Sequence, residues 1–257
     1  MIRIILNGYA GKLGKAIRDL TELPDCPAVI TAGADINGDS SATGFPLFKT
    51  LKQCDISADV LVDCSHHSAT PDVLNYAVEN NIPVVICTTG ITSDIEKLIE
   101  KAAETIPVFH SPNMSLSVSL AVNLAKRTRN AFTALGLDFD IEIIEEHHSG
   151  KHDAPSGTAL LFANEINYDG KYNYVYGRNP QSPPRTENEI GIHAVRGGSI
   201  VGDHTVLFAQ DGETLEIKHS ASTRSVFAKG VLAAVAFIYE KKNGIYSMQN
   251  LIDAIII

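Results

Sequence analysis

The chain contains few cysteines, and no two of them have the spacing of a pair. Cys26, Cys54, Cys64 and Cys87 stand far apart and form no C-x-x-C motif. This spacing indicates neither a disulfide framework nor a cysteine-based zinc site, and it suits buried thiols in a reducing compartment. We therefore expect these residues to serve as ordinary free thiols.

The chain also lacks a long hydrophobic run and an excess of positive charge. No apolar stretch reaches the roughly 20 residues that span a bilayer, and the start MIRIILNGYAG enters a strand pattern without the features of a signal peptide. The formal net charge of -9 argues against a broad surface for nucleic acid or an anionic membrane. We expect a cytoplasmic protein with a small-molecule partner, binding neither nucleic acid nor membrane.

The overall composition is typical of a globular protein. The chain has 257 residues, of which 44% are hydrophobic and 20% charged. This is enough to bury one large core or two smaller ones. No internal repeat or low-complexity stretch is evident, so the chain is expected to fold throughout.

The first half of the chain alternates short β-branched runs with helical stretches. Near-continuous apolar strands that alternate with helices predict a parallel sheet covered on both faces, which is a doubly wound α/β architecture. The apolar runs lie at 2–6, 28–35, 60–65 and 83–89, and the helical stretches at 11–23, near 71–80 and near 92–104.

The second half of the chain changes rhythm. A long helix is predicted from about 114 to 132, and strand patterns follow it. Turns that resemble hairpins at Gly197-Gly198 and Asp211-Gly212 favour antiparallel pairing of these strands. We expect a second, α+β domain built on an open, largely antiparallel sheet, followed by a C-terminal helix.

Three glycines lie between the first predicted strand and the first predicted helix. Gly8, Gly11 and Gly14 form a G-x-x-G-x-x-G pattern in the segment IRIILNGYAGKLGKAI. At such a turn the backbone approaches a pyrophosphate closely, and the N–H groups of the helix N-terminus bind it. A tight strand-to-helix turn without a ligand is the simpler interpretation, but the β-α context favours dinucleotide binding.

Two residues near this loop point to different cofactors. Asp35 ends the second strand, where a carboxylate accepts hydrogen bonds from the ribose hydroxyls of an adenine nucleotide. Lys12 lies inside the glycine loop, where a positive charge would neutralise a 2′-phosphate. The choice between NADH and NADPH therefore stays open. The run CTTG at 87–90 ends a strand at the sheet edge where nicotinamide or its ribose is expected.

The stretch EEHHSGKHDAPSGTALL at 145–161 brings together titratable and anion-binding groups. It follows a strand pattern and precedes a helical run, so that 155–158 is predicted to begin a helix and to form an anion site. A plain N-cap role would also explain Ser156 without a ligand. Lys151 adds a positive charge four residues upstream of the proline.

Two adjacent histidines in this stretch suit proton transfer better than metal binding. His147 and His148 would point to opposite faces of a continued strand, and no spaced carboxylate or cysteine ligand accompanies them. We therefore expect no metal. As proton donors near neutral pH they suit a site for an anionic substrate that must be protonated. Glu145 and Glu146 are interpreted only as the end of the strand.

Several motifs taken together resemble one enzyme family. EEHHSGKHDAPSGTA, NGYAGKLG, VICTTG, SPNMSLSV and IGIHAVRGGSIVGDHTVLFAQDGETLEIKHSASTR span nearly the whole chain. In this order they resemble the 4-hydroxy-tetrahydrodipicolinate reductase family, also called dihydrodipicolinate reductase, of the diaminopimelate–lysine pathway. The resemblance implies NADH- or NADPH-dependent reduction of an unsaturated cyclic dicarboxylate in the cytoplasm, with hydride added to the ring and a proton added beside it.

The resemblance also implies roles for individual residues. It places His147 as the general acid and Lys151 as the residue that binds a carboxylate and assists protonation. The substrate-binding positions that it implies are His148, Ser156, Gly157 and Thr158. The cofactor-contact positions are Gly8, Tyr9, Ala10, Gly11, Lys12, Leu13, Gly14, Asp35, Thr88, Thr89, Gly90, Pro112, Asn113 and Met114.

The architecture implied by the resemblance has two domains. A Rossmann-like dinucleotide-binding domain would cover 1–113, with the C-terminal segment 224–257 packed back on it. The substrate-binding and oligomerisation domain would cover 114–223. Members of the family are usually homotetramers formed through the sheets of this second domain.

The chain departs from the family pattern at three places. Ile36 follows Asp35 where many members carry a basic residue that holds a 2′-phosphate, which weakens the case for NADPH. Cys87 stands at a position that is commonly glycine. DCSHHSAT, which contains His66 and His67, replaces a different family segment, so that no role carries over to these two histidines.

Two other interpretations of the whole chain remain open from the residues alone. One is another Rossmann-fold oxidoreductase, which would lack an explanation for the histidine–lysine cluster. The other is a non-catalytic nucleotide-binding sensor, which would have no need of that cluster.

Overall fold

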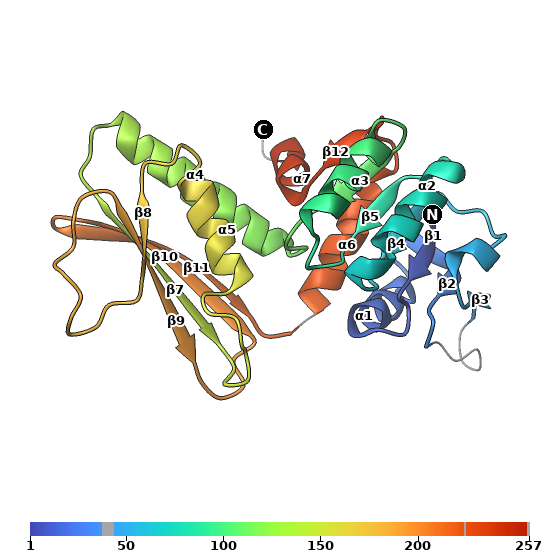
Figure 1. The fold of residues 1–257 in the computed structure, drawn as a ribbon, viewed down its shortest axis with the longest axis horizontal. Helices are drawn as coiled ribbons and strands as arrows, with labels where there is room; N and C mark the ends of the chain where they lie inside the picture. Colours follow the sequence, from blue (N-terminus) through green and yellow to red (C-terminus); the bar gives the residue numbers. More distant parts are fainter. Residues whose placement is uncertain (38–43, 224, 256–257) are drawn as a thin grey trace. The chain divides into compact units, whose positions relative to one another are not determined.

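The chain folds into two compact units. The computed structural model describes residues 1–37, 44–223 and 225–255. Met1–Leu116 and Arg224–Ile257 form unit 1, and Ser117–Thr223 form unit 2 (Figure 1). In the C-terminal segment expected at 224–257, residues 224, 256 and 257 lie outside the described residues.

Unit 1 is built on a seven-stranded sheet in which all neighbouring strands are parallel. The order is β12-β6-β5-β4-β1-β2-β3. Read from the β3 edge, strands β1 to β6 follow the Rossmann order 3-2-1-4-5-6, and β12 is added beside β6. The strands are β1 Ile2–Asn7, β2 Ala28–Ala34, β3 Leu47–Phe48, β4 Val60–Asp63, β5 Val84–Ile86, β6 Pro107–His110 and β12 Gly244–Tyr246.

Helices cover both faces of this sheet because its strands are apolar on both sides. On β1, Ile4 and Leu6 pack into a core with α1, α6 and α7, while Ile5 packs into a second core with α2 and α3. The doubly wound architecture is therefore confirmed. The helices are α1 Lys12–Thr21, α2 Thr70–Glu79, α3 Ser93–Ala103, α6 Ser225–Ile238 and α7 Met248–Ile255, with short 3-10 turns at Leu51–Gln53 and His67–Ala69.

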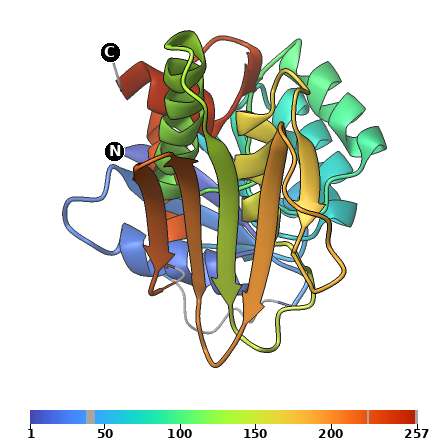
Figure 2. The ribbon, with the colours of Figure 1, turned by 90° about the vertical axis from the view of Figure 1, so that its left-hand side faces the viewer.

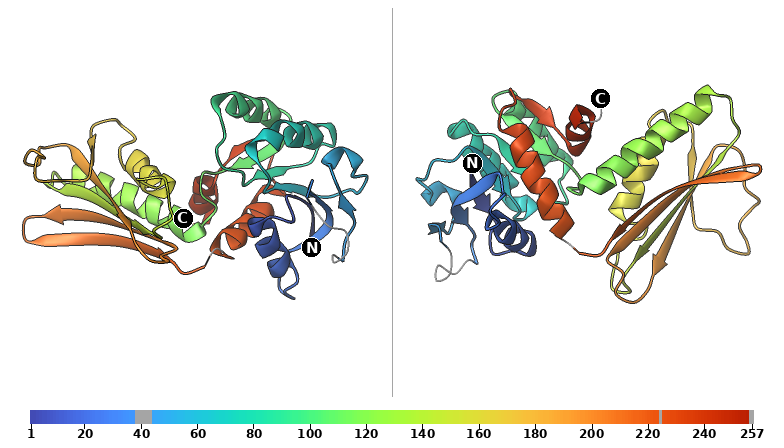
Figure 3. Two further views of the ribbon diagram at one scale, coloured as in Figure 1. Left: turned by 60° about the horizontal axis from the view of Figure 1, so that its bottom comes forward. Right: turned by 180° about the vertical axis from the view of Figure 1, so that it is seen from behind.

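Unit 2 is a five-stranded sheet with two helices packed on one face. Figure 2 views the sheet with the helices behind it, and Figure 3 shows the long helix α4 running along that face. Alternate residues of β7, including Ile141 and Ile143, join the helices in one apolar core. The elements are α4 Leu116–Ala134, β7 Asp140–His147, α5 Gly157–Ile166, β8 Asn173–Tyr176, β9 Glu189–Arg196, β10 Gly202–Gln210 and β11 Glu213–Ala221.

The sheet of unit 2 is mixed. Its order is β11-β10-β7-β9-β8, with antiparallel pairs on the β10 side of β7 and parallel pairs on the β9 side. The hairpin predicted at Asp211-Gly212 is confirmed, because Gln210 pairs with Glu213 and the φ of Gly212 is +88°. The α/β plus α+β fold class is thus confirmed, with parallel pairing contributing more than expected.

The hairpin predicted at Gly197-Gly198 is wrong. The segment joins β9 to β10, but β7 lies between these two strands. A pair of glycines favours a reversal of the chain, yet it does not determine which strands become neighbours. Here β7 pairs with β9 in parallel and with β10 in antiparallel orientation, so the turn passes over the end of a third strand.

Among the described residues, no helix is long and apolar enough to cross a membrane.

Candidate active site

The glycine loop of unit 1 leaves no room for side chains at two of its positions. A Cβ on Gly8 would lie 2.7 Å from the carbonyl carbon of Cys64, and the φ of Gly8 is +81°. A Cβ on Gly14 would lie 2.3 Å from the carbonyl oxygen of Gly8. These close approaches keep the turn between β1 and α1 tight, and they bring the first turn of α1 close to the end of β1.

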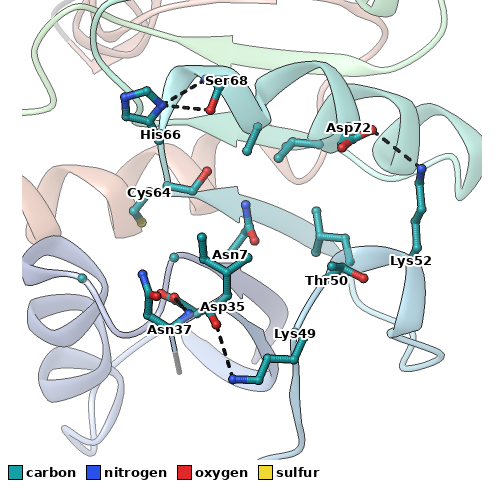
Figure 4. Close-up of a pocket in the computed structure, with 17 residues that line it drawn as sticks. Asn7, Asp35, Asn37, Lys49, Thr50, Lys52, Cys64, His66, Ser68 and Asp72 are labelled. Carbon is teal, nitrogen blue, oxygen red and sulfur yellow. Dashed lines mark hydrogen bonds and ion pairs between the residues drawn. The ribbon is translucent and has the colours of Figure 1, made fainter. Parts of the chain in front are cut away.

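A cavity of about 540 Å³ opens at this loop (Figure 4). Of the residues predicted from the sequence, Gly8, Gly11 and Asp35 line it together. The other predicted cofactor residues do not line this cavity. Residues that the sequence analysis did not assign to the cofactor also line it, namely Asn7, Ile36, Asn37, Lys49, Thr50, Leu51, Lys52, Cys64, Ser65, His66, Ser68, Ala69, Asp72 and Val73.

Asp35 closes one side of the cavity and ties the glycine loop to the end of β2. Its Oδ2 accepts the N–H of Ala10 at 3.1 Å, and its Oδ1 accepts the N–H of Asn37 at 2.8 Å. Lys49 lines the same cavity and donates from Nζ to the carbonyl of Ile36 at 3.3 Å. A carboxylate and an ammonium group thus flank the same space, while Lys12 is exposed and does not line it.

A buried carboxylate organises the carboxyl ends of three strands. Asp63, at the end of β4, is fully buried. It accepts hydrogen bonds from Asn7 Nδ2 at 2.8 Å, Ser65 Oγ at 2.6 Å and Thr88 Oγ1 at 2.9 Å. The hydroxyl of Thr88 is therefore committed to the protein interior, whereas Thr89 and Gly90 behind it are exposed at the sheet edge.

Several predicted cofactor residues have structural contacts of their own. The side chains of Tyr9 and Met114 are buried in the core of unit 1. Asn113 accepts the N–H of Ser115 at 2.8 Å and shapes the turn before α4. Ala10 and Pro112 are exposed, and Leu13 is partly buried.

The polar cluster of unit 2 follows from the register of its sheet. On β7, Glu145 and His147 continue the buried phase that begins with Ile141. Across the strands, His204 of β10 pairs with Glu145, and Arg196 of β9 pairs with His147. Residues in register share a face of the sheet, so these four polar side chains meet where the apolar core ends.

Glu145 is the hub of this cluster. Its side chain is fully buried, and Arg196 donates to both of its oxygens, from Nη1 at 2.9 Å and from Nη2 at 2.7 Å. The N–H of Ser156 donates to Oε1 at 3.0 Å. Burial alone would raise the pKa of Glu145, but Arg196, His147 and the Ser156 amide outweigh it and hold this pKa below its usual range.

His147 is held on three sides. Its Nδ1 lies 2.5 Å from Oε2 of Glu145, and its ring meets the ring of His204 edge to face at 5.2 Å. A Cβ on Gly202 would lie only 2.9 Å from its Nε2, so the imidazole rests directly over this glycine. The His147 residue is 8% exposed. One ring nitrogen is therefore held by a carboxylate, while the other packs against the backbone of Gly202.

The first turn of α5 begins beside this cluster. Ser156 is the N-cap, and its Oγ accepts the N–H of Ala159 at 3.2 Å, so the N-cap interpretation is confirmed. The same Oγ lies 3.0 Å from Nε2 of His204. Gly157 is exposed with open space where a Cβ would stand, and Thr158 is partly buried. The N-terminus of α5 is therefore accessible at Gly157 to a small anion.

Lys151 lies in the loop between β7 and α5 with an internal counterion. Its Nζ forms an ion pair with Oδ1 of Asp153 at 2.8 Å, and its N–H donates to the carbonyl of His148 at 3.1 Å. The Lys151 side chain is 22% exposed and that of Asp153 59% exposed. The ammonium group holds the pKa of Asp153 below its usual value. His148 is partly buried in the same loop.

The sequence analysis missed Glu145, Arg196 and His204 as members of this cluster. Burial, reinforced by the charge of His147, lowers the pKa of His204 to about 4, so its ring is neutral near pH 7. The signal for Glu145 was present in the sequence, because it stands in the buried phase of an apolar strand. Arg196 and His204 required the strand register. Within the described residues, no group of three His, Cys, Asp or Glu side chains is arranged to hold a metal ion.

Comparison with known proteins identifies the family. The family model described as "Dihydrodipicolinate reductase, N-terminus" matches residues 2–114, and the model described as "Dihydrodipicolinate reductase, C-terminus" matches residues 117–252. The chain belongs to the dihydrodipicolinate reductase family. It is accordingly a nicotinamide-dependent reductase of lysine biosynthesis, as the sequence motifs predicted.

Relatives of this dihydrodipicolinate reductase match it over nearly the whole length of the chain. A 4-hydroxy-tetrahydrodipicolinate reductase of Caldanaerobacter subterraneus subsp. tengcongensis is 44% identical over 255 residues, with 98% of each chain covered. The enzyme of the same name from Clostridium novyi is 44% identical over 256 residues, with 99% of each covered. A dipicolinate-bound dihydrodipicolinate reductase structure from Paenisporosarcina sp. TG-14 has a TM-score of 0.80 and 25% identity, covering 97% of this chain and 99% of that chain.

Proposed function

We propose that unit 1 binds the reduced nicotinamide cofactor and that unit 2 binds and protonates a cyclic dicarboxylate. The substrate is 4-hydroxy-tetrahydrodipicolinate or its dehydrated form, dihydrodipicolinate, and the product is tetrahydrodipicolinate. The dicarboxylate dipicolinate is bound in the related structure from Paenisporosarcina. The observation that carries the proposal is that Glu145 holds both the His147 ring and the Ser156 amide, which joins a proton donor to an anion site.

The residues of unit 1 fit a dinucleotide. Gly8 and Gly11 line the cavity without side chains, so the backbone is free to approach a pyrophosphate at the start of α1. Asp35 lines the same cavity with a carboxylate suited to ribose hydroxyls. When bound, the reduced nicotinamide supplies the hydride. At the carboxyl ends of the strands, Asp63 holds the side chains of Asn7 and Thr88 in place by hydrogen bonds.

The residues of unit 2 provide two places for negative charge. Lys151 binds one substrate carboxylate, which replaces Asp153 as its counterion. The Asp153 side chain is largely exposed and turns into solvent when it is replaced. The first turn of α5 binds the other carboxylate through the N–H groups of Gly157 and Thr158 and the hydroxyl of Thr158. Ser156 supports this turn from the protein side, because its N–H donates to Glu145 and its Oγ contacts Ala159 and His204. His148 completes the substrate side of the loop.

His147 supplies the proton. Hydride addition to a conjugated imine builds negative charge on the substrate, and a positioned acid removes it. Because Nδ1 of His147 is occupied by Glu145, Nε2 is the atom that faces the substrate. His147 therefore donates from Nε2, and Lys151 lowers the barrier by stabilising the developing charge.

The activity is tested by following the absorbance of reduced nicotinamide, with the substrate generated enzymatically and NADH and NADPH run in parallel. We expect turnover in the wild-type chain. Turnover with neither cofactor, in a folded protein that binds nucleotide, would refute the proposed reaction. This outcome would support a nucleotide-binding sensor.

Replacement of His147 by glutamine tests the acid. Loss of a general acid typically costs 10²–10⁴-fold, so kcat of His147→Gln should fall by about 100-fold or more while cofactor affinity is unchanged. His152→Gln is the matched control, because His152 is exposed in the same loop. Near-normal kcat in His147→Gln, with an unchanged pH profile, would show that His147 is not the general acid.

Asp35 and Ile36 test the cofactor preference. We propose that the chain uses NADH at least as well as NADPH, because Asp35 lines the cavity and Ile36, which is 74% exposed, supplies no charge for a 2′-phosphate. Asp35→Ala should weaken NADH more than NADPH, and Ile36→Arg should strengthen NADPH selectively. Equal losses of both cofactors in Asp35→Ala would refute its contact with the ribose.

We also propose a cytoplasmic homotetramer formed through unit 2. All four cysteines are free thiols, which fits a reducing compartment. On the sheet face opposite α4 and α5, the partly buried Ile144 and Leu207 and the exposed Val195 stand among charged side chains such as Glu142. Light scattering coupled to size-exclusion chromatography tests the assembly, and a monomer at micromolar concentration would refute it.

A further inference from the structure

Glu145 is a fully buried carboxylate directly behind the proposed acid. We propose that Glu145 is a positioning residue that keeps a proton on Nδ1 of His147, so that every proton gained or lost by the ring is carried by Nε2. This inference rests on the proposed function of His147 as acid. It adds a residue and a proton assignment that the role of the histidine alone does not specify.

The assignment follows from the hydrogen-bonding capacity of a carboxylate. Arg196, His147 and the Ser156 amide hold the pKa of Glu145 below its usual range, so the side chain is ionised near neutral pH. An ionised carboxylate only accepts hydrogen bonds. At 2.5 Å from Oε2, Nδ1 must therefore be the donor. The neutral ring then has a bare Nε2, and the protonated ring carries its transferable proton there.

The carboxylate is itself held rigidly. Arg196 donates to both oxygens of Glu145, and the N–H of Ser156 donates to Oε1. Arg196 also donates from Nη2 to the carbonyl of Asp153 at 2.6 Å, which ties this pair to the loop that carries Lys151. The orientation of the His147 ring is thus fixed through contacts that extend to both proposed anion-binding elements.

The charged groups around His147 have opposite signs. On its own strand it faces Glu145, on β9 it faces Arg196, and on β10 it faces His204. His204 is neutral near pH 7, and the Lys151–Asp153 pair of the following loop is balanced. Glu145 stabilises the protonated ring, while Arg196 offsets part of the same negative charge. A carboxylate without Arg196 would hold the proton more tightly.

Kinetics of Glu145→Gln test the role of the charge. The amide retains the shape and an acceptor oxygen but not the charge, so we expect kcat to fall by about 10- to 100-fold. The alkaline limb of the kcat profile should move to lower pH, because the protonated ring is less stable. Glu145→Asp keeps the charge, so it should recover part of the activity and move the alkaline limb of the kcat profile back toward its wild-type position. Glu146→Gln, on the opposite face of β7, is the matched control and should leave both unchanged.

A spectroscopic measurement on the wild-type chain needs neither substrate nor variant. With ¹⁵N-labelled histidine, NMR distinguishes which nitrogen of each ring carries a proton. We expect the neutral form of His147 to be protonated at Nδ1, with a far-downfield proton signal from the short contact with Glu145. Neutral His147 protonated at Nε2 would overturn the inference even if Glu145→Gln failed to fold.

The two failures are distinguishable. If His147→Gln retains full activity while wild-type His147 is protonated at Nδ1, the proposed acid is wrong and the positioning by Glu145 stands. If His147→Gln is inactive while Glu145→Gln keeps the wild-type kcat and pH profile, the acid stands and the positioning role is overturned.

Discussion

The buried ring of His204 makes unit 2 sensitive to acid. Its pKa is lowered from 6.5 to about 4, first by burial and then by the charge of His147. The unfolded chain therefore takes up a proton as the pH falls below about 6.5, and the folded chain does not do so until about 4. Stability is lost across this window and not below it, because both states are then protonated. The lowered pKa corresponds to about 3 kcal/mol.

Replacement of His204 by glutamine should remove this sensitivity. A side chain that does not titrate contributes no proton uptake, although it loses the stacking of the ring on Phe162 and so lowers stability at every pH. For a chain of this size, about 3 kcal/mol corresponds to about 6–12 °C in Tm. Relative to its own value at pH 7, the variant should therefore lose about 6–12 °C less than the wild type on acidification to pH 4.

Calorimetry of both proteins between pH 7 and pH 4 measures this difference. The carboxylates of the chain titrate in both proteins, so their contribution cancels when the two pH dependences are compared. His152→Gln serves as the control for loss of an exposed histidine and should follow the wild type. If His204→Gln loses as much Tm as the wild type over this range, the buried neutral ring is not the cause.

Three further predictions concern glycines at which an added Cβ would meet a neighbouring atom. Gly14→Ala would bring a Cβ to 2.3 Å from the carbonyl of Gly8 and should cost about 1–3 kcal/mol, seen as a lower Tm. Gly11→Ala meets that oxygen at 3.3 Å and should keep the Tm but weaken NADH binding, since Gly11 lines the cavity; the reverse ranking would refute the assignment. Gly202→Ala would push the His147 ring and should lower kcat by about 10-fold or more with cofactor affinity intact, whereas unchanged kcat would show that the ring tolerates displacement.

The architecture of unit 1 could be predicted because its signals are local. The run from Ile2 to Leu6 is apolar throughout, as a strand covered on both faces requires, and the glycines that follow it favour a turn into a helix. The strands of unit 1 that the sequence analysis did not identify are short, and Pro107–His110 is the longest of them, with four residues. Leu47–Phe48 and Gly244–Tyr246 contain only two and three residues, too few to show a period, and they exist because the sheet offers an edge for pairing.

The order of strands in unit 2 could not be predicted from the same kind of signal. Glycine pairs mark where the chain reverses, and at Asp211-Gly212 reversal and pairing coincide. At Gly197-Gly198 they do not, because β7 occupies the position between the two strands. The choice depends on the whole sheet: the apolar face of β7 is best buried at the centre, where it has neighbours on both sides.

The same reasoning explains which parts of the candidate site were found. His147, Lys151 and Ser156 lie within ten residues of one another, so their proximity was visible in the sequence. Arg196 and His204 are distant along the chain and reach Glu145 only through the registers of β9 and β10. Spacing along the chain does not encode such contacts.

Glu145 was visible in the sequence but was given too little weight. From Ile141 through Ile143, the apolar phase of β7 predicts that the next two in-phase positions, Glu145 and His147, also face the core. A carboxylate in a buried phase is too costly to serve only as a strand end, so it requires a cation and further donors nearby. Arg196 and the Ser156 amide meet that requirement. An acidic residue in phase with a buried strand, two positions before a histidine, is therefore itself evidence that the histidine is held by a charge.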